Sequence, residues 1–121
     1  MYLMIAAILF ALGALGGLFM AVRSFKGQSI PVPVAVLHGL AGATGLVLLL
    51  VAVLTGMGGT TAQIALGVLL VAAIGGFYLL SFHLRKERHP KAVILVHALV
   101  AVVGFLTLLM AIYQTTTTAA T

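Results

Sequence analysis

The sequence predicts an all-α membrane protein, a four-transmembrane-helix bundle built from two tandemly repeated helical hairpins. Of its 121 residues, 64% are hydrophobic and only 6% are charged, against roughly 25% charged residues in a soluble domain. The apolar residues fall into four long runs, and the second half of the chain repeats the rarer residues of the first half. A water-soluble monomer is therefore excluded.

The four predicted spans are residues 1–22, 32–55, 61–84 and 92–113. Each is long enough to cross about 30 Å of hydrocarbon as a helix. Helices are expected because irregular backbone in lipid leaves N–H and C=O groups unpaired, and because barrel strands would be shorter and would alternate. The first run lacks a basic N-terminal region, so we interpret it as a retained span rather than a signal peptide.

Prolines and glycines mark the predicted turns between the spans. Pro31 and Pro33 stand at the start of the second span, and Pro90 precedes the fourth. The Gly58–Gly59 pair lies between the second and third spans. Proline is favoured in the first turn of a helix, and paired glycines break helices.

The basic residues lie in two of the three loops. By the positive-inside rule both of these loops face the cytoplasm, and both termini lie outside a bacterial-type inner membrane. The charge pattern therefore indicates topology and attraction to anionic membrane lipid, with no nucleic-acid partner. The six residues are Arg23 and Lys26, then Arg85, Lys86, Arg88 and Lys91.

Two compositional absences exclude whole classes of chemistry. Glu87 is the only acidic residue, so mechanisms that need paired carboxylates or a carboxylate inside the membrane are excluded. The chain has no cysteine, which excludes disulfides, thiolate metal sites and covalent c-type haem attachment.

A shift of 59 residues superimposes the first helical hairpin on the second. Repeat one covers 1–59 and repeat two covers 60–118 of a single transmembrane domain, 1–121. Each unit holds two spans, so both copies have the same orientation and their pseudo-two-fold axis runs along the membrane normal. The matching pairs are Gly16 with Gly75, Gly17 with Gly76, Pro31 with Pro90, His38 with His97, and Gly45 with Gly104.

The spacing within each repeat predicts geometry. His38 lies about 10 Å beyond Pro31 along its helix, at 1.5 Å per residue. Gly17 lies a similar number of residues before the loop, so it should share the depth of His38, as Gly76 should share that of His97. The glycines either allow close helix packing or leave room for a large flat ligand beside the two imidazoles.

An unpaired imidazole nitrogen in hydrocarbon costs about 1 to 3 kcal/mol, so a matched pair needs partners. A haem iron would bind one nitrogen of His38 and one of His97, and the remaining N–H could meet a backbone carbonyl or a hydroxyl. A porphyrin between the second and fourth spans would turn its edges toward glycines that leave room for it. The predicted cofactor-binding glycines are Gly16, Gly17, Gly75, Gly76, Gly45 and Gly104.

With His38, His97 and their glycine neighbours, the chain resembles the small four-helix membrane b-type cytochromes, including the cytochrome b561-like group. The resemblance implies that these histidines are axial ligands of a non-covalent haem b. It also implies one-electron transfer, with a quinol or a redox protein as partner. Those relatives often carry two haems, but here Ser24 and Ile30 occupy the repeat positions of His83 and His89. Only one haem is therefore expected from the paired histidines, and a larger number is left open.

His83 lies about one turn from the predicted cytoplasmic boundary. It could contact a haem propionate, with Arg23, Lys26 or Arg85 adding charge. We favour the alternative, an interfacial histidine hydrated among lipid headgroups. His89, next to Pro90, is expected to be more solvated still.

Two other functions stay open at this stage. One is a non-haem structural or accessory subunit, in which the histidines pair with each other and with Thr or Ser groups. The other is a small transporter or quinone-binding module. We favour an electron-transfer protein over an enzyme with its own substrate, and leave a homo-oligomer open.

Overall fold

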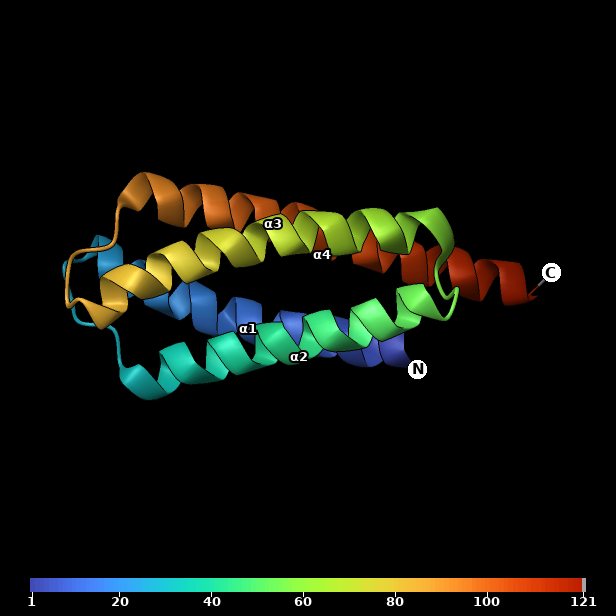
Figure 1. Cartoon of the computed structure of the whole chain (residues 1–121), viewed down its shortest axis with the longest axis horizontal. Coiled ribbons are helices and arrows are strands. Elements are labelled where there is room, and N and C mark those ends of the chain that lie inside the picture. The colour runs from blue at the N-terminus through green and yellow to red at the C-terminus, as the bar shows by residue number, and fades with distance from the viewer. Residues whose placement is uncertain (121) are drawn as a thin grey trace.

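The computed structural model describes residues 1–120, which form four long helices joined by short loops (Figure 1). The helices are α1 (Tyr2–Phe25), α2 (Val32–Leu54), α3 (Gly59–Leu84) and α4 (Lys91–Ala120). All four are long and apolar enough to cross a membrane. The four predicted spans are thus confirmed as helices, and they indicate an integral membrane protein.

The helices pack as two hairpins. α1 lies against α2 and α3 against α4, while α1 also meets α4 and α2 also meets α3. In the part of the chain that the structure describes, α2 and α4 do not approach each other closely, and neither do α1 and α3. These two pairs therefore lie diagonally across the bundle. His38 on α2 and His97 on α4 can meet only through its centre.

The two ends of the bundle differ in charge. The α1–α2 and α3–α4 loops lie together at one end, and both termini lie with the α2–α3 loop at the other (Figure 1). All the lysines and arginines are at the first end, which we call the basic end; the other is the uncharged end. Lys91 of α4 reaches the Phe25 ring of α1 there, with its Nζ 5.4 Å from the ring centre. A cytoplasmic location for the basic end stays a prediction.

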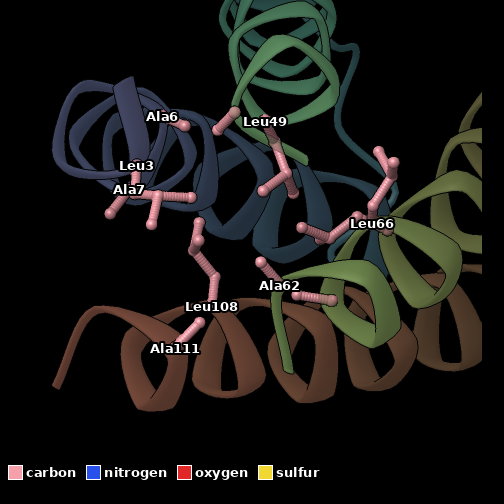
Figure 2. Packing of buried hydrophobic residues seen from close by; sticks show 11 residues of the cluster. Leu3, Ala6, Ala7, Leu49, Ala62, Leu66, Leu108 and Ala111 are labelled. Atoms are coloured by element: carbon pink, nitrogen blue, oxygen red, sulfur yellow. The ribbon is translucent and has the colours of Figure 1, made fainter. Parts of the chain in front are cut away.

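The buried core lies at the uncharged end, where side chains from all four helices converge (Figure 2). Six of its eleven residues are alanine, which suits a membrane bundle because small side chains let helix backbones approach. Leu49 and Leu108 are its largest fully buried side chains, and the 59-residue shift relates them. The cluster is Leu3, Ala6, Ala7, Leu49, Ala52, Ala62, Ala65, Leu66, Leu69, Leu108 and Ala111.

The fourth helix continues past its predicted end at residue 113. It runs through the threonine-rich segment to Ala120, although threonine is a modest helix former. The Thr115 hydroxyl donates to the Ala111 carbonyl oxygen at 2.8 Å, and the Thr117 hydroxyl donates to that of Tyr113 at 2.8 Å. These hydroxyls thus find their hydrogen-bond acceptors on their own helix.

The two basic loops begin with the same backbone turn. Gly27 has φ +70° and Lys86 has φ +56°. The next residue in each loop donates its N–H back to a helix carbonyl, from Gln28 to Arg23 and from Glu87 to Phe82, each at 2.9 Å. This is a left-handed helix cap. Glycine adopts it without strain, whereas the Cβ of Lys86 is crowded.

We therefore expect opposite effects from exchanging the residue types at these two positions. Lys86→Gly should raise the free energy of unfolding by about 1 kcal/mol. Gly27→Ala should lower it by a similar amount, although open space surrounds Gly27. Reversible unfolding in detergent micelles measures both changes. Effects of the same sign would contradict a backbone origin.

Candidate functional site

The structure brings His38 and His97 together at the centre of the bundle. Their ring centroids lie 6.2 Å apart and their ring planes make an angle of 76°. Both side chains are half-buried. The spacing of residues along the two hairpins predicts this meeting, because it places both histidines at one depth.

Each imidazole is held by a backbone carbonyl of the partner helix in its own hairpin. His38 Nδ1 lies 2.7 Å from the carbonyl oxygen of Gly13 on α1, and His97 Nδ1 lies 2.7 Å from that of Ala72 on α3. A carbonyl oxygen only accepts, so Nδ1 must donate in both rings. In the neutral imidazole this leaves Nε2 with a lone pair, which is the form that binds metals. Both rings are thus fixed in the tautomer that offers Nε2 as a ligand.

Gly17 and Gly76 explain why those carbonyls are accessible. Each glycine stands four residues after the accepting carbonyl, and a helical side chain covers the surface of the turn that precedes it. A Cβ at Gly17 would lie 3.0 Å from Cε1 of His38, and one at Gly76 would lie 3.2 Å from Cε1 of His97. Glycine at these positions therefore leaves room for the imidazole itself, at the depth that the spacing predicts.

The other predicted glycines have different neighbours. A Cβ at Gly16 or Gly75 would make ordinary contacts with the histidine of the same hairpin, at 3.7 Å and 3.5 Å. Gly45 packs under the Phe10 ring, and Gly104 lies under Leu69. All six predicted glycines thus face a side chain of the protein. Their contact with a porphyrin stays a prediction.

The ligand set at the bundle centre is limited to two imidazoles. Within residues 1–120, no three His, Cys, Asp or Glu side chains come together as a metal-binding cluster. A tetrahedral zinc site needs four ligands, usually three or more from the protein. Two imidazoles alone suit a metal whose remaining ligands come from a cofactor, as in bis-histidine haem.

His83 and His89 form a second imidazole pair, at the basic end. Their ring centroids are 6.0 Å apart, and both side chains are half-buried. The turn at Lys86 folds the loop back onto the end of α3, so His89 is partly covered as well. The expectation that His89 is the more solvated of the two stays a prediction. Burial, and secondly the nearby His83, lower the pKa of His89 below its ordinary value of 6.5. The predicted contact of His83 with a propionate stays a prediction.

The sequence predicts the two histidines and allows a backbone carbonyl as the partner of each imidazole N–H, but it does not identify which carbonyl. The acceptors are main-chain carbonyls of Gly13 and Ala72, which carry no residue-type signature. A signal did exist, since Gly17 and Gly76 each stand four residues after the accepting residue, and the two acceptors are themselves related by the 59-residue shift.

Comparison with models of protein families, with curated proteins and with solved structures finds no match to this chain. Its function must therefore be inferred from its own residues and their geometry.

The close approach of Gly17 to His38 predicts a sensitive position. Gly17→Ala should displace the ring, weaken the bond from Nδ1 to the Gly13 carbonyl, and cost about 1 to 3 kcal/mol of stability. Gly39→Ala is the matched control, because nothing lies within 4 Å of a Cβ there, and alanine favours the helix. Nitrogen-15 NMR of the imidazoles reports the tautomer. An unchanged His38 signal in Gly17→Ala would contradict this role.

The lowered pKa of His89 predicts that the fold weakens in mild acid. The unfolded chain binds a proton at this side chain at higher pH than the folded chain does, so stability rises with pH across that interval. The contribution of His89 is present above pH 6.5 and is lost as the pH falls through the folded-state pKa. Unfolding measured across this range tests it. His89→Gln should flatten the dependence, and a steeper dependence in that variant would contradict the assignment.

Proposed function

We propose that the protein is a b-type membrane cytochrome that binds one haem b between His38 and His97 and acts in one-electron transfer. The observation that supports this most strongly is that both imidazoles are in the same tautomer, with Nδ1 bound and Nε2 free. They meet across the bundle, and both Nδ1 atoms are engaged by main-chain carbonyls. Two Nε2 lone pairs remain for one metal centre.

The separation of the rings suits two axial ligands. Metal–imidazole bonds of about 2 Å, plus about 1 Å from each nitrogen to its ring centre, put two ring centroids on opposite sides of a metal about 6 Å apart. The observed separation is 6.2 Å. A bound haem would supply an iron that alternates between its ferrous and ferric states.

The chain's own residues would hold and insulate this centre. The carbonyls of Gly13 and Ala72 would keep the imidazoles oriented with Nε2 free, as outer-shell acceptors do for metal-binding histidines. The alanine-rich core would exclude water from the uncharged side. At the opposite end, the arginines and lysines would attract the negative charge of the propionates, with His83 as one predicted contact.

The surroundings fit an electron carrier rather than an enzyme. No carboxylate lies near the two histidines, because Glu87, the only acidic residue, is in the α3–α4 loop. A carboxylate that could pair with them in acid–base chemistry is therefore lacking. The electron donor or acceptor would be a lipid-soluble quinol or a redox protein that meets the bundle in the membrane. The basic loops would face the cytoplasm, and both termini would lie outside.

A structural role is the second candidate, and one observation favours it. Both imidazole bonds tie the two helices of a hairpin together, which stabilises helix pairs in lipid without any cofactor. Under this alternative the protein would be colourless and stable when isolated from haem-replete cells.

Absorption spectroscopy of the purified protein, oxidised and reduced, tests the proposal. We expect a Soret band and split visible bands of low-spin haem. His38→Ala and His97→Ala should each abolish the low-spin spectrum, because each removes one axial ligand. His89→Ala is the matched control and should retain it. A colourless wild-type protein from haem-replete cells, or normal bands in His97→Ala, would refute bis-histidine ligation.

A further inference from the structure

The His83–His89 pair is present in only one of the two basic loops, which are otherwise alike in backbone conformation. Both loops have the same left-handed turn, at Gly27 and at Lys86. In the first loop the positions that correspond to His83 and His89 hold Ser24 and Ile30. Since the first loop makes the same turn without imidazoles, the turn does not require them. The backbone turn of the second loop therefore does not explain why His83 and His89 are present.

The surroundings of this pair are strongly positive. Arg85 forms an ion pair with Glu87, the only carboxylate side chain, at 3.6 Å, and its guanidinium lies 4.7 Å from the centre of the Phe82 ring. Lys91 lies over an aromatic ring of α1. Lys86 and Arg88 are exposed and make no ion pair among the described residues, and the first loop adds Arg23 and Lys26 at the same end.

Within residues 1–120, neither of these half-buried imidazoles forms an ion pair with a carboxylate. The burial of His89, and secondly its proximity to His83, lower its pKa, and an anion between the two rings would act in the opposite direction. With ring centroids 6.0 Å apart, one oxyanion could accept hydrogen bonds of about 2.8 Å from both rings. A metal cation would face the repulsion of the surrounding arginines and lysines.

We propose that His83 and His89 form a binding site for a phosphate oxyanion, with Lys86 and Arg88 at its rim. Two sources share this chemistry, the phosphate of a lipid headgroup and inorganic phosphate in solution. The site does not depend on the proposed haem. It competes with the predicted propionate contact of His83, so the two assignments can be separated.

The test follows the histidine Cε1–H signals of the full chain in detergent micelles while inorganic phosphate is added at constant ionic strength. We expect saturable shifts for His83 and His89, none for His38 and His97, and tighter binding below pH 6.5 than above it. His83→Gln and His89→Gln should each weaken binding about tenfold. Lys26→Gln, which removes a positive charge from the first loop, is the matched control and should change the affinity less than about twofold.

Nanodiscs distinguish a lipid headgroup from inorganic phosphate as the source of the bound anion. They are made from a phosphate-free galactolipid, with or without phosphatidylglycerol. Shifts of His83 and His89 on adding phosphatidylglycerol assign the lipid headgroup, and shifts only with inorganic phosphate assign the free anion; either supports the site. The His38 and His97 signals report whether each variant is folded.

Three results would overturn the proposal. They are shifts that do not saturate, an affinity in His89→Gln equal to that of the wild type, and binding confined to haem-free protein. The last result would assign the pair to a propionate. A colourless protein that still binds phosphate would refute the proposed haem alone.

Discussion

The hydrogen bond from each central imidazole to a helix carbonyl is the interaction on which the site depends. It selects the tautomer, fixes the ring and ties the two helices of a hairpin together. It also requires a carbonyl that no neighbouring side chain covers, and so requires glycine at Gly17 and Gly76. The depth of each histidine is matched to this opening. The hydrogen bond to the carbonyl therefore determines together where glycine stands, how closely the two helices pack and which imidazole nitrogen stays free.

The two hairpins have equivalent side chains in the interior of the bundle but different side chains in the basic loops at its surface. Leu49 and Leu108 fill equivalent places in the core at the uncharged end, and His38 and His97 make equivalent bonds at the centre. Because the two environments are equivalent, His38 and His97 are both left with a free Nε2. A single hairpin supplies only one such imidazole. In the basic loops the backbone is alike but the side chains differ. Sequence differences in these loops cost little stability, because the turn depends on its backbone conformation rather than on the side chains around it.

Hydropathy and proline position predict the helices because lipid leaves a long apolar segment no other way to satisfy its backbone. Residue counting predicts that Gly17 lies beside His38 because the rise of a helix is constant. Other features escaped prediction for physical reasons. The Gly13 carbonyl has no side-chain signature, and the position of His89 depends on a left-handed conformation at Lys86 that the residue type disfavours. The helix also continues through residues 115–118, although threonine is a modest helix former.

The alanine-rich core occupies only the uncharged half of the bundle, and this unequal packing has a mechanical consequence. That half holds nearly all of the buried side chains, whereas the half between the histidines and the basic loops holds few. Ile94 is the one buried hydrophobic side chain beyond His97 on α4 toward those loops. Separating the hairpins between the histidines and the basic loops would therefore uncover fewer buried side chains than separating them at Leu49 and Leu108.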